Sequence, residues 1–277
     1  NYVSKNADVR PENFGTHKVV TKNSEVFEDL EMFMNAPEEL ASSLLEMGIS
    51  SMKIWPFDFA KGARSGLEIS NEDLKKSILP FKKIRKSHGD RIKIKAELHG
   101  LWNLQTSKII CKALEEFDMD WIEDPIWMDR LVDIPKLANH TTQPLAGGET
   151  LGGISQIYDL ISTADIAFPI IDVTWGGGIT FAKKAAAIAE SCKKSIAFHD
   201  CSGPITLVVS THLALACNNV IEQEITRGFF YSWYKDLVLN LPTIKNGYIS
   251  LEELPGLGIK LNDDYLKNSN VILRQSK

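Results

Sequence analysis

The sequence of 277 residues lacks the features that mark several classes of protein. It contains no run of about 18 apolar residues, so we expect no membrane-spanning helix and no membrane partner. Lysine and arginine are scattered and the net charge is −5, so the chain has no basic patch of the kind that binds nucleic acid. The four cysteines form no Cys-x-x-Cys pair, and reduced thiols in a cytoplasmic protein are the simplest interpretation.

The chain also starts without a recognisable leader. Asn1 to Lys5 have neither the apolar core of a signal peptide nor a starting Met, so we expect the chain to begin partway through a longer protein. Hydrophobic content of 44% and a length that suits one α/β barrel predict a large core. We expect this barrel over residues 37–250. A poorly assigned segment, 1–36, could hold the first barrel strand and its loop, and residues 251–277 form a tail.

The first readable elements are a helix and a strand. Proline and acids at Pro37 and the next two positions indicate a helix start, and the strand that follows it runs from Ile49 to Trp55. A loop from Phe57 to Ile69 is longer than a usual connection, which makes it a candidate active-site element. Ser70 then opens a second helix in a capping-box pattern.

From there the alternation of strand and helix is regular. Strands are predicted to end near Glu97, Glu123, Gly148, Ile171, Phe198 and Gln223. This alternation predicts an all-parallel sheet covered by helices. An open doubly wound sheet fits it too, but such a sheet takes its ligand at one switch point. Polar residues follow nearly every strand here, which favours a barrel with its active site at the carboxyl-terminal rim.

Three glutamates share one position in this repeat. Glu97, Glu123 and Glu149 are separated by 26 residues each, the length of one strand-plus-helix unit. Equal spacing places them at the same ends of three successive parallel strands. Their mutual repulsion would cost several kcal/mol unless a cation lay among them. All-oxygen ligation favours a hard ion, and we predict one Mg²⁺ in the site.

The next three strand ends carry Asp172, His199 and Glu224, at gaps of 23, 27 and 25 residues. An aspartate beside a histidine can bond one ring nitrogen, fix the tautomer and raise the basicity of the imidazole. His199 would then act as a general base or acid on a metal-bound substrate. A histidine after an apolar run is usually a satisfied core residue, but the shared register with the carboxylates favours the catalytic interpretation.

Four other residues are weaker candidates. His99 lies two residues beyond Glu97 and faces the same way in an extended segment; it could be a ligand or a hydrogen-bonding neighbour, and we favour an acid catalyst. Lys53 could pair with a substrate carboxylate or be a solvated lysine at the rim. Trp55 and Trp102 could line the substrate pocket or cap the barrel, and capping is the simpler role. Three glycines, 176–178, indicate a tight strand-to-helix turn.

Taken together, these stretches resemble the barrel domain of the enolase superfamily, in its mandelate-racemase-like branch, which contains the acid-sugar dehydratases. The resemblance covers about residues 37–260 and is specific because the motifs occur in this order at these intervals. The motifs are Glu97-Leu98-His99-Gly100, Trp121-Ile122-Glu123-Asp124-Pro125, Gly148-Glu149-Thr150, Asp172 with Gly177-Gly178, His199-Asp200 with Gly203-Pro204, Gln223-Glu224 and Pro255-Gly256-Leu257-Gly258.

The resemblance implies a modified (β/α)7β barrel in which the three glutamates bind Mg²⁺ and Asp172–His199 is the catalytic pair. It implies that Glu224 steadies the substrate or intermediate, and that a histidine at position 99, as in galactonate dehydratase-like members, assists departure of hydroxide. The expected reaction removes the proton next to a sugar-acid carboxylate, passes through a metal-stabilised enediolate and yields a 2-keto-3-deoxy acid. Such enzymes are lyases, and homo-oligomers are common among them.

The sequence departs from the family pattern in three places. The Lys-x-Lys of the racemases reads Lys53-Ile54-Trp55, which disfavours a two-base racemase. The first barrel strand is poorly matched, and we expect the family's amino-terminal α+β capping domain to be largely absent from this chain. The alternatives are a racemase or epimerase of a 2-hydroxy acid on the same scaffold, or a noncatalytic barrel. The intact carboxylates and Asp–His pair count against the noncatalytic barrel.

Overall fold

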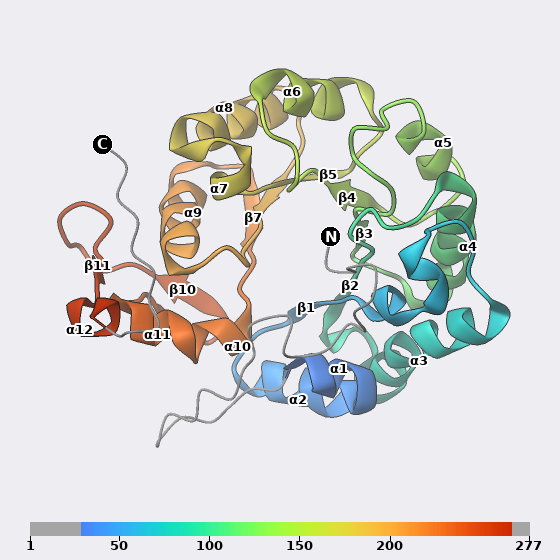
Figure 1. The fold of residues 1–277 in the computed structure, drawn as a ribbon, viewed down its shortest axis with the longest axis horizontal. Coiled ribbons are helices and arrows are strands. Elements are labelled where there is room, and N and C mark those ends of the chain that lie inside the picture. The colour runs from blue at the N-terminus through green and yellow to red at the C-terminus, as the bar shows by residue number, and fades with distance from the viewer. Residues whose placement is uncertain (1–28, 268–277) are drawn as a thin grey trace.

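The main sheet is a ring of seven parallel strands in a computed structural model that describes residues 29–267. The strands lie in chain order, each paired with the next (Figure 1). They are β1 (Ser51–Ile54), β2 (Lys93–Glu97), β3 (Trp121–Glu123), β4 (Leu145–Gly147), β5 (Phe168–Ile171), β6 (Ile196–Phe198) and β7 (Val220–Gln223). A doubly wound sheet reverses its order at a switch point, so the sequential order confirms the predicted barrel.

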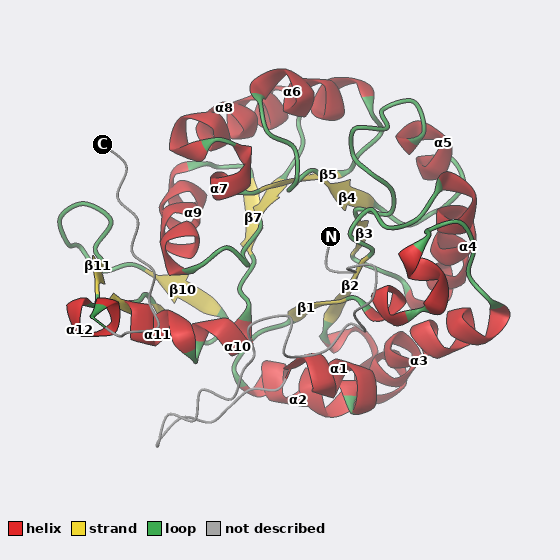
Figure 2. Cartoon of the chain, in the orientation of Figure 1, coloured by secondary structure: helices red, strands yellow, loops and turns green. Residues whose placement is uncertain are grey.

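Helices cover the outside of this ring (Figure 2). Those that precede or connect the strands are α1 (Asp29–Asn35), α2 (Pro37–Glu46), α3 (Asn71–His88), α4 (Leu104–Leu114), α5 (Ile134–Ala138), α6 (Ile154–Thr163), α7 (Val173–Gly176), α8 (Gly178–Ser191) and α9 (Pro204–Ala216). The loop after β1 contains two short 3₁₀ turns, η2 (Pro56–Phe59) and η3 (Lys61–Arg64).

The predicted helix starts are present. Pro37 occupies the first turn of α2, and the Ser70 side chain accepts a hydrogen bond from the Asp73 amide at the start of α3. This bond satisfies one of the amides that a helix leaves without a partner. At the turn between α7 and α8, Gly177 and Gly178 have φ values of 128° and 86°. Residues with a side chain rarely adopt these angles, which accounts for the glycines there.

The core lies between the ring and its helices. Side chains that are fully or almost fully buried there include Ile94, Ile122, Phe198, Ile110 and Leu160, which come from both layers. Inside the ring, a smaller apolar group joins Trp121, Ala146, Ile170 and Ala197. This interior packing is typical of a barrel, which is filled by side chains rather than hollow.

Side chains connect the two ends of the ring, where β1 and β7 share no backbone pairing within residues 29–267. Lys95 on β2 forms an ion pair with Glu222 on β7 at 2.9 Å and with Asp120 at 2.9 Å. Arg227, at the start of α10 (Arg227–Phe230), makes two hydrogen bonds of 2.6 and 3.0 Å to Asp29 on α1. These buried contacts hold the last strand and its helix against the first part of the chain.

The chain after β7 folds beside the barrel. Its elements are α11 (Trp233–Leu237), β8 (Val238–Leu239), β9 (Thr243–Lys245), β10 (Tyr248–Ser250), β11 (Lys260–Leu261) and α12 (Asp263–Leu266). β10 pairs with β9 and β11 pairs with β8, so the first part of the predicted tail, 251–267, is attached to the segment before it. Of residues 1–36, the structure describes only 29–36, which contain the helix α1. The strand predicted in the earlier part of this segment lies outside the described residues.

No helix in residues 29–267 has the length and apolar character that crossing a membrane requires.

Candidate active site

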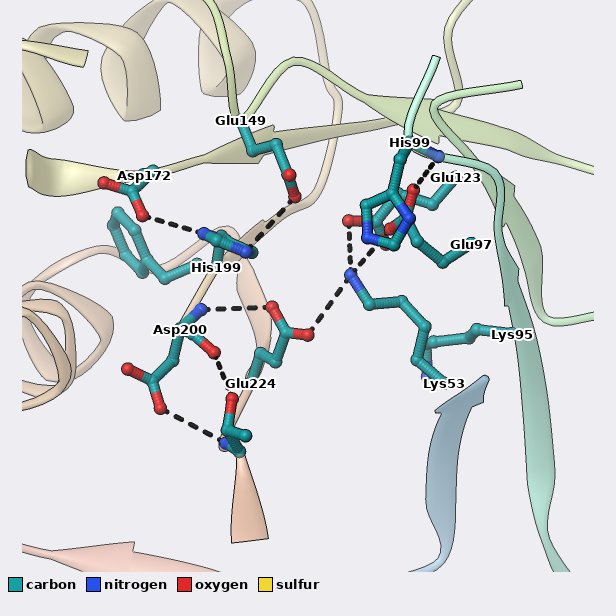
Figure 3. A network of polar contacts seen from close by, with 12 residues as sticks. Lys53, Lys95, Glu97, His99, Glu123, Glu149, Asp172, His199, Asp200 and Glu224 are labelled. Atoms are coloured by element: carbon teal, nitrogen blue, oxygen red, sulfur yellow. Dashed lines mark hydrogen bonds and ion pairs between the residues drawn. The ribbon is translucent and has the colours of Figure 1, made fainter. Parts of the chain in front are cut away.

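The predicted functional side chains converge on a cavity at the carboxyl ends of the strands (Figure 3). The cavity has a volume of about 840 Å³ and extends into the interior of the ring. Its lining includes Lys53, Trp55, Glu97, His99, Glu123, Glu149, His199 and Glu224. Because parallel strands end at one edge of a barrel, residues up to 171 positions apart in the chain meet in this one space.

The three glutamates form one cluster. Sheet pairing sets Glu97 directly beside Glu123, and Glu149 follows the next strand by two residues. One carboxylate oxygen from each lies within 4.8 Å of the others, and all three side chains are buried. The structure therefore brings together the three residues that the 26-residue spacing selected.

The partners of these carboxylates differ. Oε1 of Glu97 accepts bonds from the amides of Leu98 and His99, at 3.0 and 2.8 Å. Oε2 of Glu123 accepts from the indole nitrogen of Trp121 at 2.8 Å. Oε2 of Glu149 is buried and accepts no hydrogen bond from residues 29–267, although it lies 3.4 Å from Nε2 of His199. A buried carboxylate oxygen without a donor is costly unless a cation lies against it.

The charges of the cluster oppose one another. Burial raises the pKa of Glu123, and Glu97, Glu224 and Glu149 raise it further, against the lowering effect of Lys53. Burial also raises the pKa of Glu149, where His199 lowers it and Glu97 raises it. For Glu97, burial is outweighed by the charges of Lys53 and His99, which lower its pKa to about 2. Three buried, oxygen-only side chains with unbalanced charge fit a hard divalent cation such as Mg²⁺.

Lys53, at the end of β1, points into this cluster. Its ammonium lies 2.6 Å from Glu123 Oε1, 3.0 Å from Glu97 Oε2 and 3.2 Å from Glu224 Oε1. Burial lowers its pKa, but the surrounding carboxylates outweigh burial and raise the pKa well above the ordinary value. Lys53 is thus an inward-pointing cation whose side chain is 14% exposed, and not a solvated rim residue. A pairing with a substrate carboxylate stays a prediction.

His199 and Asp172 form a buried pair. Nδ1 of His199 and Oδ2 of Asp172 are 2.7 Å apart, and the other oxygen of Asp172 accepts the Trp175 amide at 2.7 Å. The ring of Trp175 lies 4.9 Å from the imidazole. Burial lowers the pKa of His199, but Glu149, Glu224 and the bond to Asp172 raise it well above the ordinary value. A divalent ion among the glutamates would offset part of this effect.

His99 reaches the cavity by a different geometry from the extended segment that the sequence indicated. β2 ends at Glu97, and His99 has a φ of 49°, so the chain turns there. The imidazole is held by Asp58, whose Oδ2 lies 2.7 Å from Nδ1. Burial lowers the pKa of His99, whereas Asp58 and Glu97 raise it to about 10. Asp58 is a residue that the sequence interpretation missed.

Glu224 is anchored at the end of β7. Its Oε2 accepts the backbone amide of Asp200 at 3.1 Å, and its Oε1 faces Lys53. Asp200 itself is buried and accepts from the Thr226 amide at 3.2 Å and the Tyr234 hydroxyl at 3.1 Å. This network connects the ends of β6 and β7 and fixes where the Glu224 carboxylate points (Figure 3).

The two predicted tryptophans occupy different places. Trp55 lines the cavity and its ring lies 6.2 Å from that of His99. Trp102 is buried beside Gly62 in the loop after β1 and is absent from the cavity lining. Its position fits the capping role, and the structure offers no support for contact with substrate. Trp175, by contrast, was missed by the sequence interpretation. It follows Asp172 by three residues, which is the spacing between a helix-capping side chain and the backbone amide whose hydrogen bond it accepts.

A family model for the enolase C-terminal domain-like proteins matches residues 36–265. Among curated proteins, D-galactonate dehydratase of Xanthomonas campestris pv. campestris is 30% identical over 199 residues, which are 70% of this chain and 52% of that protein. D-galactonate dehydratase of Klebsiella pneumoniae is 28% identical over 228 residues, 78% of this chain and 59% of that protein. The chain thus spans about half the length of these relatives.

Solved structures with the same architecture include two enolases. One, from environmental sequencing of the Sargasso Sea, has a TM-score of 0.82 and 39% identity, covering 88% of this chain and 66% of that one. The other, of the mandelate racemase subgroup from Agrobacterium tumefaciens, has a TM-score of 0.80 and 43% identity, covering 83% of this chain and 63% of that one.

Proposed function

The chain belongs to the enolase C-terminal domain-like family, and on this premise we propose that it dehydrates a sugar acid with the help of Mg²⁺. The curated relatives named above are D-galactonate dehydratases, which supports this reaction class. The substrate would be an aldonate or aldarate, and the product a 2-keto-3-deoxy acid. The site contains a glutamate cluster that would stabilise charge and two histidines that would serve as base and acid, the three groups that this elimination needs.

The three glutamates would hold the metal. A proton next to a carboxylate is very weakly acidic, because its removal leaves a second negative charge on the same group. Bound Mg²⁺ supplies stabilisation of that developing charge, of the order of several kcal/mol. Glu97, Glu123 and Glu149 suit this task because they are buried, oxygen-only and close together.

His199 is the proposed base. Its Nδ1 is engaged by Asp172 at 2.7 Å, so Nε2 is the nitrogen that remains to accept the C2 proton. Asp172 also stabilises the imidazolium that forms when this proton arrives. The indole of Trp175 lies against the same imidazole and limits its movement.

His99 is the proposed acid. After the C2 proton has moved to His199, the electron pair forms a C2–C3 double bond and the C3–O bond breaks. A proton from His99 converts the departing hydroxyl to water, which leaves an enol that tautomerises to the 2-keto acid. Lys53 and Glu224 are proposed to contact the carboxylate and hydroxyls of the substrate. One observation carries this proposal: two histidines, each bonded to an aspartate, enter one cavity beside the glutamate cluster.

The test is a screen of sugar acids with the full-length protein and Mg²⁺, scored for formation of a 2-keto acid. We expect one acid or a small group of related acids to react, and the reaction to disappear in His199→Asn. Silence across the library, with Mg²⁺ bound by calorimetry, would contradict the proposal. Solvent deuterium entering C2 of recovered substrate with inversion would instead indicate a racemase or epimerase.

A further inference from the structure

We propose that Asp58 is a positioning residue that makes His99 deliver its proton from Nε2, so that the site contains a second Asp–His pair. This inference rests on the proposed function for its chemical meaning. Asp58 lies in η2, 41 residues before His99, in the loop that follows β1. Nothing in the spacing of strand ends selects it.

The geometry of the pair repeats that of the catalytic base. Asp58 Oδ2 and His99 Nδ1 are 2.7 Å apart, and Asp172 Oδ2 and His199 Nδ1 are also 2.7 Å apart. In each pair the aspartate engages the same ring nitrogen. Nδ1 is thus engaged in each pair, so proton transfer to or from a substrate would use Nε2. His199 lies beside Glu149, whereas His99 lies beside Glu97 (Figure 3).

Within residues 29–267 the Asp58 side chain has no hydrogen-bond partner other than His99. Its side chain is 1% exposed, and its second oxygen accepts no hydrogen bond from residues 29–267. Burying a carboxylate costs free energy unless it has partners. The bond to the His99 imidazole is the interaction that offsets this cost for Asp58. The carboxylate thus serves His99 rather than the surrounding loop.

The loop is anchored independently of this bond. The Thr106 hydroxyl donates to the Leu67 carbonyl at 2.9 Å, and the Asn103 amide group donates to the same carbonyl at 3.1 Å. The backbone amide of Asn103 also donates to Gly66 at 2.8 Å. Loss of the Asp58 bond should therefore leave Nδ1 without this acceptor while these contacts keep the loop in place.

The chemical consequence concerns which nitrogen loses its proton. When His99 gives a proton to the departing C3 hydroxyl, the neutral imidazole that remains has one N–H. Asp58 accepts that N–H at Nδ1 and thereby favours the tautomer in which Nε2 was the donor. Without Asp58, the Nδ1–H tautomer loses the acceptor that favours it, and the proton is less often aimed at the leaving group.

The experiment compares the full-length parent with Asp58→Asn on two substrates, once a reactive sugar acid is known. One has the natural C3 hydroxyl, and the other has fluoride at C3, which leaves without a proton. We expect the hydroxyl substrate to lose about 10²-fold or more in kcat, the size of a positioned acid's contribution, and the fluoride substrate less than about threefold. Exchange of the C2 proton with solvent should continue.

A second readout does not depend on turnover. Nitrogen-15 NMR of the His99 imidazole in its neutral form should show the Nδ1–H tautomer in the parent and a mixture in D58N and D58A. Thr106→Val, which removes one loop anchor without touching His99, should change neither readout. Equal losses on both substrates, or an unchanged tautomer in D58N, would overturn the proposal. If no sugar acid reacts at all, the proposed function fails and the tautomer alone decides the role of Asp58.

Discussion

The ammonium of Lys53 lies 2.6 Å from Glu123 Oε1 and 3.0 Å from Glu97 Oε2, inside the carboxylate cluster. Two of the three proposed metal ligands are therefore already paired with a positive charge from the protein. A lysine in this place stabilises the buried carboxylates by itself, and it also repels any second cation that approaches them. Lys53 and a divalent ion would thus compete for the same oxygens.

Replacing Lys53 with Met should strengthen metal binding. Removal of a unit positive charge a few ångström from the ligands should raise the affinity for Mg²⁺ by about tenfold or more, since such a pair is worth more than about 1.4 kcal/mol even at an effective dielectric constant of 20. When a chelator removes the ion, K53M should have an unfolding free energy roughly 3–5 kcal/mol lower than that of the parent, because the buried carboxylates of Glu97 and Glu123 lose their lysine partner. Calorimetry and urea unfolding measure the two effects, and Lys61→Met is the charge-matched control. Unchanged affinity would contradict the competition.

Mg²⁺ should stabilise the folded protein through the glutamate cluster. At a concentration of 100 times its Kd, the ion should add about 2.7 kcal/mol to the free energy of unfolding, and a chelator should remove this increment. Glu149→Gln should abolish most of it, because it removes one ligand charge. Thermal unfolding with and without Mg²⁺ gives the measurement, and Glu116→Gln on the surface is the control. An equal increment in E149Q would place the metal elsewhere.

His199→Asn should separate proton abstraction from folding. We expect exchange of the substrate C2 proton to fall by about 10³-fold, within the range for a positioned general base. His99→Asn should keep that exchange and lose elimination, because its proton is needed only when the hydroxyl leaves. Deuterium exchange followed by NMR distinguishes the two variants, with His140→Asn as control. Loss of exchange in both would show that the roles are not divided in this way.

Asp200 should make stability depend on pH. Burial raises its pKa to about 7, assisted by Glu224 and opposed by the Thr226 amide, whereas an unfolded aspartate has a pKa of about 3.9. Between these values the folded state binds more protons than the unfolded state, so this contribution to stability is lost as pH rises from about 4 to 7.

The variant Asp200→Asn removes this titration. Relative to the variant, the parent should lose about 2–3 kcal/mol of unfolding free energy between pH 5 and pH 8. Urea unfolding of both proteins at each pH gives the difference directly, and other titrating groups cancel in the comparison. A constant difference across this range would mean that Asp200 stays ionised in the folded protein.

Lys95 and Glu222 should be energetically coupled across the ring. Their side chains are 2.9 Å apart, and Lys95 is almost fully buried. Replacing Lys95 with Met alone should cost about 3–5 kcal/mol, because Glu222 loses its partner and Asp120 keeps only Lys93. In the double variant K95M/E222Q the two costs should be less than additive. Urea unfolding of the parent, the two single variants and the double variant measures this coupling. If the losses of unfolding free energy simply add, the pair does not help to hold β7.

The sequence predicted what depends on a repeated unit and missed what depends on loop conformation. Glu97, Glu123 and Glu149 were found because one strand and one helix take up a fixed length of chain, and the same register led to Asp172, His199 and Glu224. Asp58 has no such register: it reaches His99 because η2 folds back over the strand ends. The inward direction of Lys53 likewise depends on the cluster that it meets.

The first strand and the C-terminal part of the chain also lack a repeated spacing from which their structure could be predicted. Polar residues obscure any repeat in 1–36, and the short pairing of β11 with β8 is set by tertiary contact rather than by a periodic pattern. Trp102 shows that an aromatic residue near a strand end need not face the cavity, because the loop after β1 covers it. Spacing along the chain cannot distinguish these cases.

The order of the strands divides the site into two adjoining arcs. Glu97, Glu123 and Glu149 follow β2 to β4, whereas Asp172, His199 and Glu224 follow β5 to β7. Under the proposed function, the glutamates of the first arc would make the substrate acidic, and His199 in the second arc would take up its C2 proton. A change confined to the second arc would then alter the fate of that proton and leave the glutamates of the first arc in place.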